Sequence, residues 1–342
     1  MTISYRTRTR LRRFFSVVTV LAVVALLIWF GWLIWLDRFI VYQRDWGAKL
    51  DFTLSADFPE GVPATPPASK PPVEILYPDT NTQRPTDPVA ETGIRGYYLD
   101  FNALKADISA VQQQLQQLPA GTAVLVDVKN PKGFFHYSTA VGEKISGEVD
   151  TARFDSLIEY LTDGKFHVIA RLPAFRDRYF GLNNIPSGIS YEGGGGALWL
   201  DKGGCFWLNP TKDKPLSYLI SITKELKNMG FDEVVFTDFC LPDGKNIIFK
   251  DDPVEAITNA AATLVEACAA DDFYVSFTGD ATFPLPQGNS RLYLENVPAG
   301  DIQTVIEQIG VDNPAVRVLF YATGHDTRYD EYSVLRPLDF AQ

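Results

Sequence analysis

Residues 216–244 read LSYLISITKELKNMGFDEVVFTDFCLPDG, and their first half has the pattern of an amphipathic helix. Asp213 and Pro215 stand where such a helix begins. Gly230 stands where it ends, because glycine adopts the left-handed conformation at a helix C-terminus without strain. Four apolar side chains recur at helical spacing and form one stripe: Leu219, Ile222, Leu226 and Met229. We therefore expect a helix that packs one face against a core.

The second half of the stretch predicts a buried strand followed by an acidic loop. Residues 234–236 are an apolar run (VVF), which is typical of a parallel strand covered on both faces. The strand is expected to end at Asp238, just before a Pro-Asp-Gly turn. Barrels of alternating strands and helices place their chemistry at the C-terminal tips of the strands. Asp238 is therefore the first candidate for a catalytic carboxylate.

From Gly93 onward, strand and helix patterns alternate, which indicates βαβ units and a parallel sheet. We expect strands at 96–100, 123–129, 166–172, 234–236, 273–278, 291–295 and 316–321. Besides the helix described above, the pattern predicts helices at 103–118, 151–161, 253–270 and 301–309. The predicted fold class is α/β, a (β/α)8 TIM-type barrel over residues 93–342.

Closure of this barrel is the open point at its C-terminus. Only residues 333–335 (SVL) remain for an eighth strand, and a Pro-rich loop at 281–289 replaces the helix expected before residue 291. The barrel is then either closed by irregular pieces or open at one side. A doubly wound sheet is the alternative fold. The first two strands are not followed by a Gly-rich phosphate loop, which argues against its nucleotide-binding versions.

The N-terminus predicts a membrane anchor. Residues 1–13 contain five arginines and no acid, and residues 14–36 are apolar apart from Ser16 and Thr19. Such a run is long enough to cross roughly 30 Å of hydrocarbon as a helix. Tryptophans crowd its far end, and the positive-inside rule keeps the basic end in the cytoplasm. A cleaved signal peptide is the alternative, but the run exceeds the usual apolar core and no small-x-small site follows.

This topology predicts a single-pass cell-membrane protein with an extracellular C-terminal domain. Residues 37–58 would form a short stalk, and prolines recur from Pro59 to Thr92. A segment of that composition forms no core and is typically extended, so residues 37–92 are expected to be a stalk and semi-rigid linker.

Charge and cysteine content limit the function classes. Without the five N-terminal arginines, 26 basic and 42 acidic residues remain, a net charge of −16, which disfavours nucleic acid as a partner. The three cysteines show neither a disulfide framework nor zinc spacing, and we expect all three to be free and mostly buried. The three histidines lack metal-ligand spacing, so we predict no metal and no cofactor.

Four segments together resemble a family of bacterial surface proteins described as putative glycoside hydrolase domains, with a TIM-type barrel. The decisive stretch carries Gly230, Phe231, Asp232, Glu233, Asp238, Phe239 and Pro242, similar to the family pattern G-F-D-E-I-x-F-D-Y-x-R-F-P. The other matching positions are residues 126–130, Gly133, Tyr137, Ser138, Ala170, Arg171, Phe175, Asp177 and residues 207–210 (WLNP). The resemblance implies a glycosidase acting on a carbohydrate polymer, and it is good over residues 93–244 and poor beyond them.

The resemblance and the strand positions suggest substrate-binding residues. Asp127 and Lys129 lie two apart, hence on one face of a strand near its C-terminal end. An internal ion pair between them is an equally good reading. Arg171 ends the next strand, where it could fix the ionisation of a carboxylate or bind an acidic group of the substrate. Tyr137 and Trp207 fall in loops on the same rim, where aromatic rings stack on sugars; for each ring taken singly, ordinary loop packing is the favoured alternative.

Glycoside hydrolysis requires two carboxyl groups that flank the scissile bond. We assign Asp238 as nucleophile or base, with Glu295 or Asp280 as the acid, and Asp100 as a weaker third candidate and rim residue. The family's Arg-Phe-Pro is Cys-Leu-Pro here, at residues 240–242, so the Arg is lost. A non-catalytic carbohydrate-binding or scaffold pseudoenzyme is therefore the alternative. A serine hydrolase would need G-x-S-x-G, which is absent.

Overall fold

The computed structural model describes residues 40–43, 47–50, 93–193 and 195–338. The chain divides into two units, Met1–Thr82 and Gln83–Gln342. In the first unit, β1 (Ile40–Gln43) and β2 (Gly47–Leu50) form an antiparallel pair. The predicted transmembrane helix at 14–36 and nearly all of the predicted linker lie outside the described residues. Among the residues that are described, no helix has the length and apolar character needed to cross a membrane.

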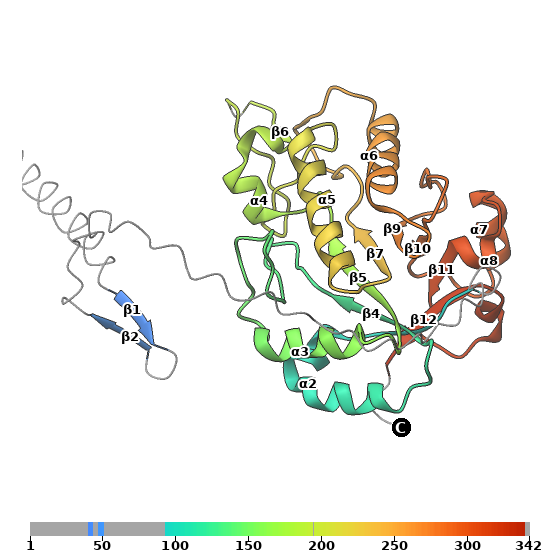
Figure 1. Cartoon of the computed structure of the whole chain (residues 1–342). Coiled ribbons are helices and arrows are strands. Elements are labelled where there is room, and N and C mark those ends of the chain that lie inside the picture. The colour runs from blue at the N-terminus through green and yellow to red at the C-terminus, as the bar shows by residue number, and fades with distance from the viewer. Residues whose placement is uncertain (1–39, 44–46, 51–92, 194, 339–342) are drawn as a thin grey trace, which may run out of the picture. The chain divides into compact units, whose positions relative to one another are not determined.

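The second unit contains a closed barrel of eight parallel strands, so the predicted (β/α)8 barrel is confirmed (Figure 1). Around the barrel the order is β10-β11-β12-β3-β4-β5-β7-β9. A closed ring excludes the doubly wound alternative. The strands are β3 (Arg95–Tyr98), β4 (Ala123–Asp127), β5 (His167–Pro173), β7 (Glu233–Thr237), β9 (Tyr274–Gly279), β10 (Leu292–Leu294), β11 (Val318–Tyr321) and β12 (Ser333–Pro337).

The weakest predicted strand closes the barrel. β12 pairs in parallel with both β11 and β3, which settles the question of an open side. Ser333 links three segments there, because its hydroxyl accepts a hydrogen bond from the Ile94 amide at 3.1 Å and donates to the Ala315 carbonyl at 3.0 Å. A polar residue at the start of a strand lowers its apolar signal in the sequence, although it is fully buried here.

Five of the helices that cover the outside of the barrel were predicted from the sequence: α2 (Phe101–Gln116), α3 (Thr151–Leu161), α5 (Asp213–Asn228), α6 (Pro253–Cys268) and α7 (Ile302–Ile309). The short helix α8 (Pro314–Arg317) was not predicted, and it takes the first two residues of the strand expected at 316–321. Within the described part of the chain no helix lies between β9 and β10, as expected from the Pro-rich loop. On α5, Leu219, Ile222 and Leu226 are fully buried, and Gly230 follows the helix with φ at +92°.

An elaborated connection, not predicted from sequence, joins β5 to α5. It contains α4 (Arg178–Asn183), a 3-10 turn (Ile185–Ser187) and β6 (Ser190–Tyr191), which pairs with β8 (Ile247–Ile248) from the loop after β7. In Figure 1 this connection lies beyond the C-terminal ends of β5 and β7. It therefore shapes the barrel mouth. A second 3-10 turn (Thr327–Glu331) precedes β12.

Side chains inside the barrel alternate with those that face the helices, as the period of a strand requires. The middle of the barrel is a packed apolar cluster that includes Leu125, Ile169, Val235, Leu319 and Leu335. The interior is therefore a core and not a pore, and a ligand can enter only at its ends.

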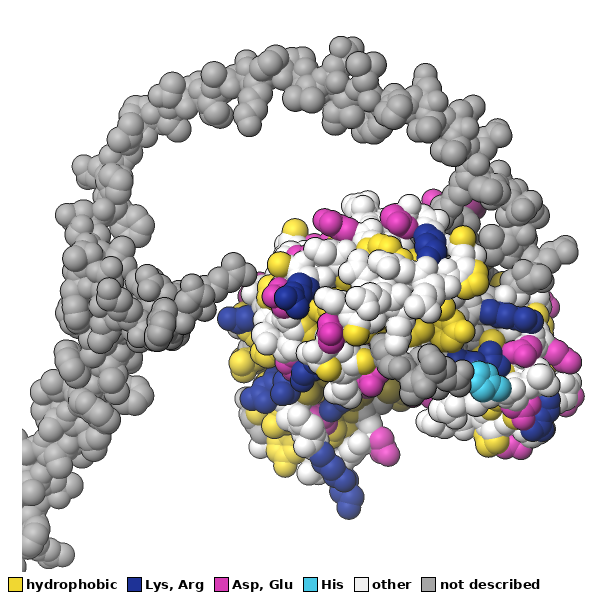
Figure 2. Space-filling model, turned by 90° about the horizontal axis from the view of Figure 1, so that it is seen from below, with side chains coloured by type: hydrophobic (Ala, Val, Ile, Leu, Met, Phe, Trp, Pro, Cys, Tyr) yellow, Lys and Arg dark blue, Asp and Glu magenta, His cyan; other side chains and the backbone are white. Residues whose placement is uncertain are grey.

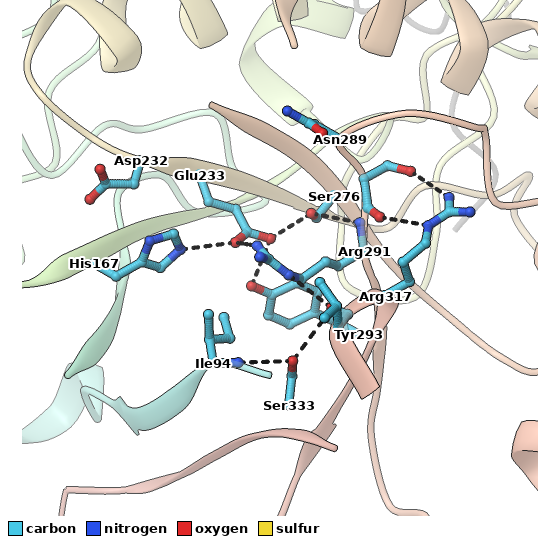
Figure 3. Close-up of polar contacts among 12 residues, drawn as sticks. Ile94, His167, Asp232, Glu233, Ser276, Asn289, Arg291, Tyr293, Arg317 and Ser333 are labelled. Atoms are coloured by element: carbon cyan, nitrogen blue, oxygen red, sulfur yellow. Dashed lines mark hydrogen bonds and ion pairs between the residues drawn. The ribbon is translucent and has the colours of Figure 1, made fainter. Parts of the chain in front are cut away.

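The N-terminal end of the barrel is filled by a buried polar network around Glu233, the first residue of β7 (Figure 3). Its carboxylate accepts hydrogen bonds from the Ser276 hydroxyl at 2.5 Å and the Tyr293 hydroxyl at 2.9 Å. It also pairs with Arg291 and, at 3.2 Å, with His167. Both oxygens of this carboxylate thus have hydrogen-bond or ion-pair partners.

On the face of the molecule shown in Figure 2, which is seen from below the view of Figure 1, basic and acidic side chains are interspersed.

Candidate active site

Two adjoining cavities lie at the C-terminal ends of the strands. The larger has a volume of about 530 Å³ and the second about 450 Å³. Arg171 and Glu295 line both, so the two cavities form one broad mouth. Tyr98 and Tyr321 line only the second cavity. The polar residues that line the larger cavity include Asp127, Lys129, His136, Glu148 and Arg176.

Asp127 and Arg171 form a two-pronged ion pair at the mouth. Asp127 ends β4, Arg171 lies two residues before the end of the neighbouring strand β5, and the two are direct partners in the register. Arg171 donates from Nε at 2.5 Å and from Nη2 at 2.9 Å to the two carboxylate oxygens. Burial lowers the pKa of Arg171, but the hydrogen bonds and charge of Asp127 outweigh it and raise that pKa. Arg171 thus holds a carboxylate, one of the two roles the sequence suggested.

Lys129 pairs with Asp177 and not with Asp127. Its Nζ lies 2.7 Å from Oδ2 of Asp177, and both side chains are fully buried. Lys129 also donates to the Pro173 carbonyl at 3.3 Å. Asp177 caps α4 by accepting from the Phe180 amide at 2.8 Å. The alternative of an internal Asp127–Lys129 ion pair is therefore wrong, because Asp127 pairs with Arg171 and Lys129 pairs with Asp177.

Asp238 follows β7 directly and is half-buried at the rim. Its φ of +49° is in the left-handed region, which is uncommon for residues other than glycine and is a frequent feature of functional sites. Burial raises the pKa of Asp238; Arg176 and Lys129 lower it, and Asp201 and Glu295 raise it, with a net upward shift. Arg176, Lys129 and Glu295 line the larger cavity, so Asp238 responds to the charges of the mouth.

An Arg176–Asp201 ion pair braces the loop over the mouth. Nε of Arg176 lies 2.6 Å from Oδ2 of Asp201, and the Trp207 indole donates to the same oxygen at 3.1 Å. Hydrogen bonds from the Cys205 amide, Arg176 and Trp207 outweigh burial and lower the pKa of Asp201. Trp207 is 8% exposed. Its ring packs in the loop and does not line either cavity, in contrast to the sugar-stacking role predicted for it.

The remaining carboxylate candidates lie in different places. Glu295 follows β10, is exposed and lines both cavities. Asp280 is exposed after β9 and accepts from the Thr282 amide at 2.7 Å and hydroxyl at 2.6 Å, so it caps a turn. Asp100 caps α2 by accepting from the Asn102 amide at 3.0 Å. Among the acid candidates Asp100, Asp238, Asp280 and Glu295, only Glu295 lines the mouth, and Asp238 lies close enough to Glu295 for that charge to raise its pKa.

Tyr137 lies behind the site. Its side chain is fully buried, and its hydroxyl donates to Glu225 on α5 at 2.8 Å. Burial and the adjacent Glu225 carboxylate raise the pKa of this hydroxyl. The geometry therefore gives Tyr137 a structural contact between the loop after β4 and α5, and not the predicted contact with substrate.

The described residues contain no group of three or more His, Cys, Asp or Glu side chains that could hold a metal ion. Cys205 and Cys268 are buried, Cys240 is exposed, and all three are free thiols. The mouth consists of carboxylates, cations and hydroxyls, a set suited to acid–base chemistry on a polar substrate.

Residues 103–267 match the family model described as "Putative glycosyl hydrolase domain". This segment of the barrel is therefore similar to that family. The putative glycosyl hydrolase domain match includes Asp127, Arg171 and Asp238 but ends before Asp280 and Glu295. It thus confirms the resemblance seen in the sequence. No curated protein matches the chain significantly.

One solved structure with a TM-score above 0.5 shows a similar fold, and two further solved structures are similar at lower scores. The PgaB (BpsB) glycoside hydrolase domain from Bordetella bronchiseptica is 12% identical, with 72% of this chain and 95% of that chain covered and a TM-score of 0.52. A hypothetical protein from Ruminiclostridium thermocellum is 23% identical, with coverages of 53% and 96% and a TM-score of 0.45. The glycoside hydrolase domain of PelA from Pseudomonas aeruginosa is 11% identical, with coverages of 72% and 94% and a TM-score of 0.44.

Sequence reasoning assigned no role to His136 and Arg176, which line the larger cavity, or to Asp201, which pairs with Arg176. Arg176 lies one position before Asp177, inside a matched motif, and that position was the only available signal. Asp201 is in an irregular loop, and His136 is in a segment expected to be a loop. Nothing in the local sequence marks either one, because only the fold buries them beside the strand ends.

Proposed function

We propose that the barrel mouth is the active site of a glycoside hydrolase that cleaves a polysaccharide. The observation that carries this proposal is the pair of carboxylates, Asp238 and Glu295, which follow β7 and β10; Glu295 lines the larger cavity, and so does Thr237, the residue before Asp238. Glycosidases require such a pair flanking the bond. The family match over residues 103–267 supports the same reaction class.

The environments of the two carboxylates suggest their roles. Burial raises the pKa of Asp238, which favours the protonated form that a general acid must hold. Glu295 is exposed to solvent, as suits the base or nucleophile. This assignment reverses the roles inferred from sequence and leaves Asp280 outside the chemistry. In the reaction, Asp238 would protonate the leaving oxygen while Glu295 activates water or attacks the anomeric carbon.

The width of the mouth suits a polymer. The two cavities share Arg171 and Glu295, so a chain that crosses from one to the other passes both side chains. Tyr98 and Tyr321 line the second cavity, and their ring centroids lie 5.8 Å apart. Aromatic faces and paired charges of this kind offer stacking and hydrogen bonds to successive sugar units.

The proposal includes the location suggested by the N-terminal sequence. Residues 14–36 would anchor the protein in the cell membrane as a single span, with the barrel outside the cytoplasm. Protease added to intact cells should release the barrel. A barrel degraded only after cell lysis would contradict this location.

A reducing-end release assay tests the activity. The chain would be incubated with a panel of wall and plant glycans, beside the variants Asp238→Asn and Glu295→Gln and the matched control Asp280→Asn. Release by the wild type and the control, but not by the other two, is expected. Equal release by Asp238→Asn would contradict the assigned acid.

The second candidate is a carbohydrate-binding domain without catalysis. The observation in its favour is that three of the four cations that line the larger cavity are already paired: Lys129 with Asp177, Arg171 with Asp127, and Arg176 with Asp201. Saturable glycan binding by a cooperatively folded chain, with no reducing ends released from any glycan, would favour this candidate over the hydrolase.

A further inference from the structure

His136 is a buried ring in the wall of the larger cavity, and neither the family match nor the sequence pattern assigns it a role. It is 1% exposed, and its backbone amide donates to the Val128 carbonyl at 2.9 Å, which returns the chain to the end of β4. Its ring centroid lies 4.2 Å from that of Phe101 and 6.1 Å from that of Phe154. The two aromatic rings hold the imidazole in one orientation.

The hydrogen bonds of this ring are incomplete. Nδ1 is buried and has no hydrogen-bond partner. Among the described residues no hydrogen bond reaches Nε2 either, although the side chain lines the cavity. A buried N–H without an acceptor is rarer in proteins than a buried acceptor without a donor. The ring therefore favours the tautomer in which Nδ1 is bare and Nε2 carries the hydrogen.

The imidazole is also neutral at physiological pH. Burial lowers the pKa of His136 to about 4, opposed by the carboxylates of Asp127 and Glu148 and assisted by Lys105. A neutral ring with a fixed tautomer donates one hydrogen bond and transfers no proton near pH 7.

We propose that His136 is a substrate-binding residue, whose Nε2–H donates a hydrogen bond to a hydroxyl oxygen of the sugar in the larger cavity. This inference rests on the proposed function, since it names a contact within that site. It goes beyond the two-carboxylate chemistry because His136 would orient the sugar ring and take no part in acid–base transfer. The substrate then supplies the missing hydrogen-bond partner of Nε2.

Nitrogen NMR of the ¹⁵N-histidine-labelled chain tests the free state without any activity. The chain has three histidines, so His136→Gln assigns the signal by its loss. We expect the Nε2–H tautomer and no protonation above about pH 5. An Nδ1–H tautomer, or protonation above about pH 6, would overturn the proposal. His325, which is exposed, supplies the reference signal of a solvated ring.

Adding cellohexaose and chitohexaose to the labelled chain tests the contact. We expect at least one to shift the His136 Nε2–H signal and to leave His325 unchanged. If neither hexamer nor any glycan that the wild type cleaves shifts this signal, the proposal fails. A shift without release of reducing ends would keep His136 as a binding residue and refute only the hydrolase.

Kinetics on a cleaved glycan separate binding from chemistry. In His136→Gln the side-chain amide keeps a donor close to the position of Nε2, whereas His136→Leu removes it. We expect His136→Leu to raise KM about tenfold with kcat nearly unchanged, and His136→Gln to stay within about threefold of the wild type. Equal KM values for the wild type and a folded His136→Leu would refute the contact while leaving the hydrolase intact.

Discussion

The two ends of strand β7 carry carboxylates whose pKa values are shifted in opposite directions. Glu233 begins the strand at the base of the barrel, and Asp238 follows it at the mouth. Burial alone would raise the pKa of Glu233, but Arg291, His167 and Ser276 lower it to about 2. Burial raises the pKa of Asp238, and its charged neighbours do not reverse that shift. Partners, and not burial alone, decide the direction in which each pKa moves.

The same contrast holds for hydrogen bonding at the two ends. At the base, Glu233, Ser276, Arg291 and Tyr293 satisfy one another. Toward the C-terminal ends of the strands, the hydroxyl of Thr278 and Nδ1 of His136 are buried without partners; among the described residues, Oε1 of Gln114 on α2 is also buried without one. Buried polar groups are normally paired, so an unpaired ring nitrogen in the wall of the larger cavity marks a place where a ligand is expected. The base stabilises the barrel, and the mouth is arranged for function.

Asp238→Asn should have the largest effect. Removing a general acid is expected to reduce kcat about 10²–10⁴-fold on the glycan that the wild type cleaves. Asparagine tolerates the positive φ at this position, and loss of a half-buried charge removes a desolvation penalty. The melting temperature should therefore not fall. An inactive variant that has also unfolded would speak against a local role for Asp238 in the mouth.

Glu233→Gln should disrupt the polar network at the N-terminal end of the barrel and leave the structure of the mouth unchanged. It leaves Arg291 as a buried charge without its counter-ion, and the free energy of unfolding should fall by about 3–5 kcal/mol. Urea unfolding would measure this loss. The control, Glu295→Gln, lies on the surface and should change stability by less than about 0.5 kcal/mol. Equal effects of the two variants would remove the distinction between base and mouth.

Lowering the pH should weaken the polar network around Glu233 at the N-terminal end of the barrel before it changes the packing. The folded-state pKa of Glu233, about 2, lies below its ordinary value of 4.5. Its ionised form therefore stabilises the fold above pH 4.5, and this contribution is lost as the pH falls toward 2. The stability difference between the wild type and Glu233→Gln should shrink across that interval in pH-dependent unfolding. A difference that stays constant with pH would show that Glu233 does not titrate in this range.

Tyr137→Phe should have the smallest effect. It deletes one hydrogen bond to Glu225, which still accepts from Thr139 at 2.6 Å and from the Ala140 amide. We expect a loss of about 1 kcal/mol in unfolding free energy and unchanged glycan binding. Weaker glycan binding with normal stability would instead restore the substrate contact that the sequence suggested.

The sequence by itself determined most strands and helices of the barrel and the position of Asp238 directly after β7. Helical spacing and glycine stops located α5, and an apolar run placed β7 with Asp238 at its tip, because these signals depend on neighbours along the chain. The sequence suggested a carboxylate partner for Arg171 without naming it, and the register of β4 and β5 shows that the partner is Asp127.

Only the tertiary structure decided the pairings between distant segments. The hydrogen bond between Ser333 and Ile94 joins residues that are 239 positions apart in the sequence. The pair Glu233–Arg291 is separated by 58 positions, and the pair Arg176–Asp201 by 25. Lys129 pairs with Asp177, and the ring of His136 is buried and neutral. Local patterns carry no information on such contacts, because the folded chain sets both the distance between two side chains and the desolvation that fixes their charge.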